Sequence, residues 1–346
     1  MENFAGVDLH KRVSQLAVLR KEREPSQLRF LNDLATVEGV LRRLPARTHI
    51  ALEATGSWWW FVEKARSMGH EVSLSHPKQT KAIASARLKS DKVDALMLAR
   101  LLRADLLPTV WIPGEKERQI RELLTHRARV VRQRTAIINE LQALYAKRNI
   151  DFEMIAKRAR AVVAGAQDLS GYGPSIVERD VELLRVLNEQ IRALDKELER
   201  IAQHDAQARR LMSIAGVGPL TAVAVCCWVG DIERFADAKK LASYFGLAPR
   251  VSQSGERERH GHITKEGNRM VRSLLVEAAL SSIRYSKGPA RKHYLGVLKR
   301  RGKKIARVAA ARKLLGAIFH MMKEGIDYPE YLKRSSALVV VYGGTD

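Results

Sequence analysis

The chain has 346 residues, which is enough for two or three domains with substantial cores. Its 61 lysine and arginine residues outnumber 38 aspartate and glutamate residues, giving a net charge of +23. A positive excess of this size favours a polyanionic partner, because neutralising phosphates releases their counterions. No apolar run approaches the ~20 residues of a membrane-spanning helix, no signal-peptide pattern is present, and the adjacent Cys226 and Cys227 fit neither a disulfide framework nor a zinc site. The composition predicts a cytoplasmic protein that binds nucleic acid and does not enter a membrane.

The first hundred residues alternate between strand and helix patterns. Helical spacing of apolar residues predicts helices over 36–44, 57–68 and 79–103. Apolar or alternating runs predict strands over residues 4–9, 13–19, 27–31, 49–53 and 71–75. This order of elements favours a mixed α/β sheet.

The predicted helix over 79–103 carries two carboxylates on one face. Asp91 and Asp94 stand three residues apart, so their side chains project in the same direction. Like charges at this spacing repel, and a divalent cation relieves the repulsion; oxygen ligands favour Mg²⁺ or Mn²⁺. The alternative is a solvated helix face on which Lys89 and Lys92 neutralise the aspartates.

Two further carboxylates end predicted strands. Asp8 lies near the end of the first strand, and Glu53 ends the strand over 49–53. Ligands gather at the carboxyl edges of open α/β sheets. Together with Asp91 and Asp94, these residues fit a two-metal site with ions about 4 Å apart.

Three short motifs contain the four carboxylates: Gly6-Val7-Asp8-Leu9-His10-Lys11, Leu52-Glu53-Ala54-Thr55-Gly56 and Ser90-Asp91-Lys92-Val93-Asp94-Ala95. In their residues and in their order along the chain, these motifs resemble those of the DEDD transposases of insertion sequences, the IS110 family. The resemblance implies an RNase H-like domain of the RuvC type. It also implies that Asp8, Glu53, Asp91 and Asp94 are catalytic and bind Mg²⁺ or Mn²⁺.

Two long helices are predicted after an exit loop over 106–113. They cover residues 115–149 and 175–210, and a break rich in glycine separates them at 165–174. Heptad spacing in the second helix predicts a coiled coil, which closes on the first helix or pairs with a second subunit. The seam residues are Leu184, Leu187, Ile191, Leu194, Leu198 and Ile201. The family resemblance implies a homo-oligomer, a dimer or tetramer on DNA.

The second half of the chain begins with a turn, residues 213–221, that is similar to a helix-hairpin-helix motif. Gly216 and Gly218 would let backbone N–H groups approach a phosphate, although a plain helix–helix connection has the same pattern. Helices are predicted over 239–247, 268–285 and 305–323, and a polar loop is predicted over 250–256. The region is therefore predicted to be mainly α-helical.

Ser254 and Gly255 lie in this predicted polar loop. On its own a Ser-Gly pair is typical of an ordinary turn. The resemblance to the IS110 family implies that Ser254 is the catalytic nucleophile of a second, transposase domain, with Ser252 as the fallback. Metal ions and nearby arginines would activate its hydroxyl.

Positive charge is concentrated in the last quarter of the chain. Residues 250–334 contain 21 basic and 7 acidic side chains, which is the electrostatic footprint of a nucleic-acid-binding surface. Arg127 and Arg134 interrupt the seam of the first long helix and present either a solvated face or a surface that follows a phosphate backbone. The candidate nucleic-acid contacts are Lys11, Arg127, Arg134, Gly216, Gly218, Arg250, Arg257, Lys265, Arg269, Lys299, Arg300, Arg301, Lys303 and Lys304.

These patterns predict four parts: a RuvC-like nuclease domain over 1–108, long helices over 109–210, a helical transposase domain over 211–334 and a tail over 335–346. The predicted function is a metal-dependent transposase with a serine nucleophile, acting on the element ends and a target DNA. The resemblance further implies a non-coding bridge RNA as guide, and a bacterial or archaeal protein associated with the nucleoid. Two alternatives stay open: a four-way-junction endonuclease that uses water, and an architectural DNA-binding protein without catalysis.

Overall fold

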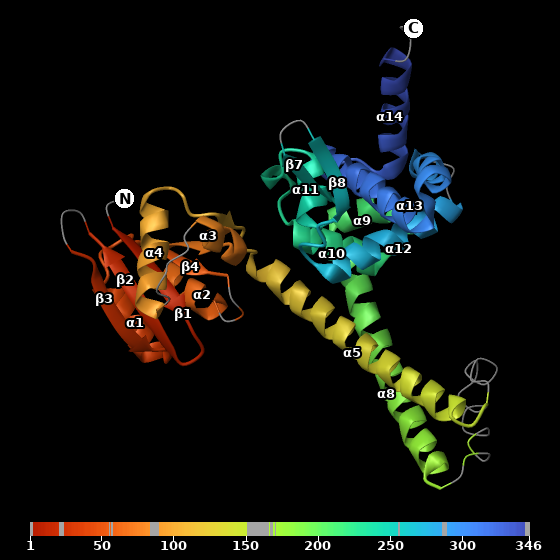
Figure 1. The fold of residues 1–346 in the computed structure, drawn as a ribbon, viewed down its shortest axis with the longest axis horizontal. Coiled ribbons are helices and arrows are strands. Elements are labelled where there is room, and N and C mark those ends of the chain that lie inside the picture. Colours follow the sequence, from red (N-terminus) through yellow and green to blue (C-terminus); the bar gives the residue numbers. More distant parts are fainter. Residues whose placement is uncertain are drawn as a thin grey trace. The chain divides into compact units, whose positions relative to one another are not determined.

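The computed structural model describes residues 3–20, 24–54, 56, 58–83, 90–150, 166, 169, 171–254, 257–285 and 289–342. Only the backbone is described for 251–254, 257–260, 289 and 336–342. The chain forms two compact units, Met1–Pro113 and Gly114–Asp346 (Figure 1). No described helix combines the length and the apolar character needed to cross a lipid bilayer.

The first unit is built on a six-stranded sheet with the order β3-β2-β1-β4-β5-β6. Strand β4 is parallel to β1 and to β5, whereas the β1–β2, β2–β3 and β5–β6 pairs are antiparallel. The prediction of a mixed α/β sheet is confirmed. Strand β6 was not predicted, because its two residues are too few to show an apolar or alternating pattern. The strands are β1 (Phe4–Leu9), β2 (Val13–Leu19), β3 (Ser26–Leu31), β4 (His49–Glu53), β5 (Glu71–Ser75) and β6 (Thr109–Val110).

Helices cover the two faces of this sheet. Alternate residues of β1, such as Ala5 and Val7, enter a core with side chains of α1 (Leu34–Arg43) and α2 (Trp59–Ser67). The opposite face packs against α4 (Asp91–Arg103), as Figure 1 shows, where Ala51 of β4 meets Leu98 and Leu101. Successive side chains of a strand point to opposite faces, so the face opposite Ala5 and Val7 belongs to α4.

The prediction of one helix over residues 79–103 was wrong. Helix α3 covers Pro77–Ile83, and α4 begins at Asp91. Ser90 has extended backbone angles and its hydroxyl accepts a hydrogen bond from the Val93 N–H, which makes it the N-cap of α4. The cap starts the helix one residue before the Asp-x-x-Asp pair. Lys89 lies outside the described residues.

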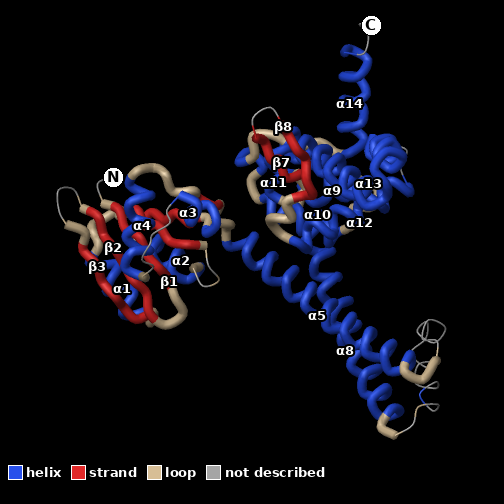
Figure 2. The backbone as a smooth tube through the Cα atoms, viewed as in Figure 1, coloured by secondary structure: helices blue, strands red, loops and turns tan. Residues whose placement is uncertain are grey.

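Within the residues that the structure describes, the regular elements of the second unit are helices and one two-stranded hairpin (Figure 2). Helices α5 and α8 pack along each other, and Arg127 of α5 forms an ion pair with Asp195 of α8 at 2.5 Å. Leu124 and Leu198 from these helices enter the same core as α10, so the predicted boundary at residue 210 falls inside one compact unit. The helices are α5 (Glu115–Ala146), α8 (Gly173–His204), α9 (Ala206–Met212), α10 (Pro219–Val229), the 3-10 helix η2 (Ile232–Arg234), α11 (Ala238–Tyr244), α12 (Arg269–Tyr285), α13 (Pro289–Glu324) and α14 (Tyr328–Tyr342).

One local prediction in this unit was wrong. Residues 250–254, part of the loop predicted over 250–256, belong to strand β7 (Pro249–Ser254), which forms a hairpin with β8 (Arg257–Ile263). Gly255 and Glu256 lie outside the described residues. These strands are polar along both faces, so no apolar alternation marks them. The helix predicted over 305–323 corresponds to the part of α13 that follows a kink at Gly302, whose φ of 76° lies in the left-handed region. The helical residues from Pro289 up to this kink were not predicted.

Gly6 of β1 allows α4 to lie directly on the sheet. A Cβ at this position would overlap the Ala95 carbonyl oxygen and come within 2.6 Å of the Ala99 amide nitrogen. Both are backbone atoms, which cannot rotate away. The close packing of α4 on β1 therefore depends on a glycine at position 6.

We expect Gly6→Ala to lower the free energy of unfolding by about 1–3 kcal/mol, the usual cost of overpacking a core, measured by urea denaturation. The control is Gly39→Ala in α1, where an added Cβ meets no atom within 4 Å. That variant should be as stable as the parent or gain up to about 1 kcal/mol from helix propensity. A Gly6→Ala protein as stable as the parent would contradict this packing.

Candidate active site

Asp8 and Glu53 lie at the carboxyl ends of neighbouring parallel strands. Val7 of β1 is paired in register with Leu52 of β4, so Asp8 and Glu53 follow this pair side by side along the chain direction. Asp8 shares its strand face with Gly6, and Glu53 shares its face with Ala51, by the two-residue repeat of a strand. Both carboxylates therefore belong to the face that α4 covers.

Helix α4 brings the other two carboxylates to the same place. Asp91 and Asp94 occupy its first turn, directly after the Ser90 cap. Negative side chains are favourable there, because the N-terminal end of a helix carries a partial positive charge. Among the described side chains, Lys92 forms no ion pair with Asp91 or Asp94. Asp91 instead faces His10, with 3.5 Å between Asp91 Oδ1 and His10 Nε2.

His10 completes a compact group of possible metal ligands. Its Nε2 lies 3.1 Å from Asp8 Oδ2, and the ligand atoms of Asp8, His10 and Asp91 all lie within 4.8 Å of one another. Burial raises the pKa of the Asp8 carboxyl above its ordinary value; His10 opposes the shift, while the charges of Asp91 and Asp94 add to it. Three of the predicted carboxylates thus interact electrostatically at one point.

Sequence reasoning did not single out His10. The signal was its spacing, since Asp8 and His10 stand two residues apart at the end of a strand and so face the same way. The turn that carries it is held by Asn32, whose Nδ2 donates a hydrogen bond of 2.6 Å to the His10 carbonyl oxygen, and whose Oδ1 accepts one from Ser14. Lys11 follows as an exposed residue.

Ser254 lies in the second unit, as the last residue of β7, with Arg257 of β8 as its register partner. The side chains of Ser252, Ser254 and Arg257 are outside the described part of the structure, and so is Gly255. The role of Ser254 stays a prediction. Burial raises the pKa of the Cys226 thiol and raises that of the Cys227 thiol to about 11. Because the thiolate is the reactive form of cysteine, these two thiols are poor candidates for the nucleophile.

Several predicted nucleic-acid contacts have clear structural surroundings. Arg127 is engaged with Asp195, and the Nε of Arg134 is buried without a hydrogen-bond partner among the described residues. Gly216 packs so closely on α12 that an added Cβ would lie 2.7 Å from the Ser282 amide nitrogen. Helix packing therefore explains why a glycine is needed at position 216, whereas Gly218, the residue before α10, faces open space.

The remaining basic candidates surround the hairpin and the kink in α13. Lys265 follows β8, and the sequence from Lys299 to Lys304 forms exposed helix on both sides of Gly302. Three basic residues of that run, together with Lys265, line one cavity, which is also lined by basic residues that sequence reasoning missed. The predicted contacts that are exposed in this unit are Arg250, Lys265, Arg269, Lys299, Arg300, Arg301, Lys303 and Lys304.

Two family models match the chain. Residues 5–147 match a DEDD transposase model of the IS110 group, and residues 208–295 match the model described as Transposase IS116/IS110/IS902 family. The first match includes Asp8, Glu53, Asp91 and Asp94, and the second includes Ser254.

Relatives with assigned names agree with these matches. A "Probable family 20 transposase" of Pseudomonas aeruginosa is 31% identical over 89% of this chain and 93% of its own length. The "Transposase for insertion sequence element IS1111A" of Coxiella burnetii is 31% identical over 76% of this chain and 74% of its own. The "Pilin gene-inverting protein" of Moraxella bovis is 28% identical over 80% of each chain. The chain therefore belongs to the IS110 family of transposases, enzymes that cleave and recombine DNA.

Proposed function

We propose that the first unit is an RNase H-like nuclease domain whose Asp8, Glu53, Asp91 and Asp94 bind Mg²⁺ or Mn²⁺. The observation that carries this proposal is the convergence of Asp8, His10 and Asp91, with Asp94 close enough to raise the pKa of Asp8. The strand order β3-β2-β1-β4-β5, antiparallel in its first half and parallel in its second, supports the fold assignment.

The donor set fits a hard divalent cation. Oxygen ligands at about 2.0–2.6 Å from one ion lie within about 5 Å of one another. The ligand atoms of Asp8, His10 and Asp91 meet this condition, because they lie within 4.8 Å of one another. Positive charge here would offset the repulsion that the aspartates exert on Asp8. The imidazole of His10 favours Mn²⁺ somewhat, because nitrogen is a softer donor than carboxylate.

The proposed reaction is transesterification of DNA by Ser254. Its Oγ forms a bond to phosphorus as one phosphate–sugar ester bond breaks; the hydroxyl proton leaves Ser254 and the departing sugar oxygen gains a proton. Attack of another strand's hydroxyl reverses these changes and frees the serine, so no oxidant and no water are consumed. Bound divalent ions would supply Lewis-acid activation of the phosphate and stabilise the leaving oxygen.

The partners follow from the same proposal. DNA is the substrate, and we infer from the family resemblance a bridge RNA as guide and a dimer or tetramer as the working assembly. The net charge of +23 supports polyanionic partners of either kind. Whether Ser254 works with the carboxylates of its own subunit or of another follows from that assembly.

Metal binding is the first test. We expect Mn²⁺ to bind the parent protein, and Asp91→Asn to weaken binding by at least about tenfold, a loss that even residues supporting a ligand produce. Isothermal titration calorimetry measures it. Asp105→Asn is the matched control: Asp105 is exposed with a φ of 55°, which asparagine tolerates, and should leave affinity unchanged. Equal affinities in both variants would contradict the site.

The chemistry is tested by trapping a protein–DNA adduct. The protein with its co-purifying RNA, Mg²⁺ and labelled DNA spanning the element junction is denatured and examined for labelled protein. We expect an adduct that disappears in Ser254→Ala and in Asp94→Asn but persists in Ser243→Ala, where Ser243 is an exposed residue of α11.

Other outcomes of this assay select the alternatives. An adduct lost only in Ser252→Ala would move the nucleophile to that residue. Metal-dependent cleavage without an adduct would indicate a nuclease that uses water. DNA-binding activity that Asp8→Asn leaves intact, without metal-dependent strand cleavage by the parent, would indicate an architectural DNA-binding protein whose carboxylates are structural.

A further inference from the structure

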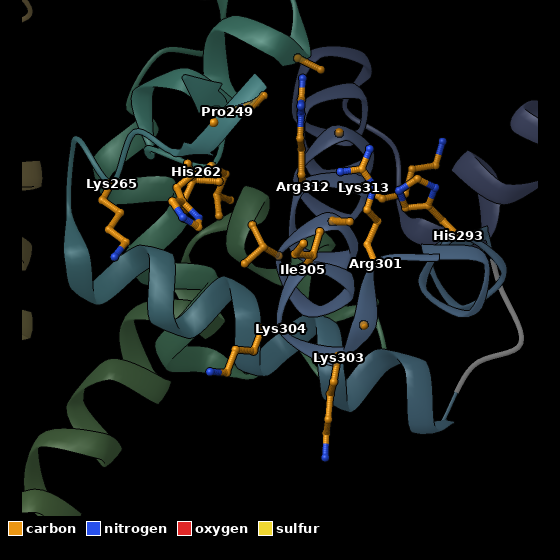
Figure 3. Close-up of a pocket in the computed structure, with 18 of the residues that line it drawn as sticks. Pro249, His262, Lys265, His293, Arg301, Lys303, Lys304, Ile305, Arg312 and Lys313 are labelled. Atoms are coloured by element: carbon orange, nitrogen blue, oxygen red, sulfur yellow. The ribbon is translucent and has the colours of Figure 1, made fainter. Parts of the chain in front are cut away.

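The second unit contains a cavity of about 1170 Å³ (Figure 3). One side is formed by the region around β8, including His262, Ile263 and Lys265, and the other by α13 beyond its kink. The cavity is larger than the roughly 300–1,000 Å³ typical of small-molecule sites. It therefore has room for part of a larger ligand.

The cavity combines an apolar surface with cationic residues. Figure 3 shows Ile305 near its middle, with His262 and Lys265 on the hairpin side and Arg312 beyond. Ile305 is 52% exposed, which is unusual for an isoleucine on a helix that otherwise packs into the core. Leu247, Ile263, Val308 and Ala309 extend the apolar surface.

Six cations line the same space, and none of the described lining residues is acidic. No ion pair among the described residues neutralises any of the six. A ligand of matching charge therefore carries several negative groups. The cations are Lys265, Arg301, Lys303, Lys304, Arg312 and Lys313.

Aromatic rings border the end of the cavity near α14. His320 and Tyr331 both line it, and their rings are nearly parallel, with centroids 6.2 Å apart and an angle of 21°. Tyr328 continues the series, with its ring centroid 6.0 Å from that of Tyr331 at an angle of 17°. Flat rings beside cations are the usual platform for unstacked bases in proteins that bind single strands.

A smaller cavity extends the cationic surface across α13. It measures about 380 Å³ and shares His293 and Lys313 with the larger one. Lys292 and Arg300 line it as well. A phosphate backbone leaving the large cavity would meet further positive charge along this path.

We propose that the large cavity binds an unpaired nucleotide of a single strand, with the base against Ile305 and near the His320 and Tyr331 rings, and the phosphates on the surrounding cations. A duplex keeps its bases stacked and would leave the apolar surface unused. The proposal rests on the proposed function, because strand exchange supplies unpaired nucleotides.

Filling the cavity without changing its charge tests the proposal. Gly316 of α13 lines the cavity, and a Cβ there meets no atom within 4 Å, so Gly316→Phe places a ring in the open space. Gly39→Phe in α1 is the matched control, since Gly39 is also helical and also faces open space. Fluorescence anisotropy is measured in EDTA at fixed salt with single-stranded DNA, RNA of the same sequence and duplex DNA.

We expect Gly316→Phe to weaken single-strand binding about tenfold, a loss of the size expected for one stacked base, and to leave duplex binding unchanged. Gly39→Phe should match the parent with every probe. The DNA and RNA arms identify which strand the cavity takes. A folded Gly316→Phe protein with parental single-strand affinity, or one that loses duplex binding equally, would overturn the proposal.

A charge variant decides the question if Gly316→Phe does not fold. Arg312→Glu should weaken single-strand binding more than duplex binding. It should also reduce the slope of log affinity against log salt by about 1, which corresponds to one phosphate contact. Lys333→Glu, an exposed position in α14 outside the cavity, makes the same charge change and should not discriminate between the probes. Because EDTA removes metal and no cleavage is required, these results stand apart from the test of the metal site and of Ser254.

Discussion

The direct contact of α4 with β1 at Gly6 is the constraint on which the candidate metal site depends. Without a side chain at Gly6, the helix backbone lies against the strand, and its first turn reaches the level of Asp8. The Ser90 cap starts the helix just before Asp91. The positive end of the helix then faces carboxylates that would otherwise repel one another, so packing and electrostatics support the same arrangement.

The two units carry different parts of the proposed chemistry. The first holds two carboxylates on its sheet and two on α4, and the second holds Ser254 and the cationic cavity on a mainly helical unit whose core includes Leu124 and Leu198. A rigid sheet edge suits metal ligands, whose positions must be kept within narrow limits. Ser254 is the last residue of β7, the first strand of a polar hairpin in the second unit.

The kink at Gly302 explains much of the charge distribution in the second unit. It divides α13, and Arg301, Lys303 and Lys304 beside it line the cavity. The later turns of α13 contribute further lining residues at intervals of four. Side chains four apart lie above one another on a helix. The stripe consists of Lys304, Val308, Arg312, Gly316 and His320.

The sequence by itself determined five of the six strands of the first unit and the concentration of positive charge, because apolar alternation and charge are local properties. The four candidate carboxylates were found through their short motifs. The break before α4, the polar hairpin and the pairing of Arg127 with Asp195 were not predicted from the pattern. The three-dimensional structure shows that His10 lies beside Asp8 and Asp91 at the strand end near α4. It also shows that Arg312 lines the same cavity as residues of β8. Tertiary structure decided the surroundings of Arg127, His10 and Arg312, since each depends on contacts between residues far apart in the chain.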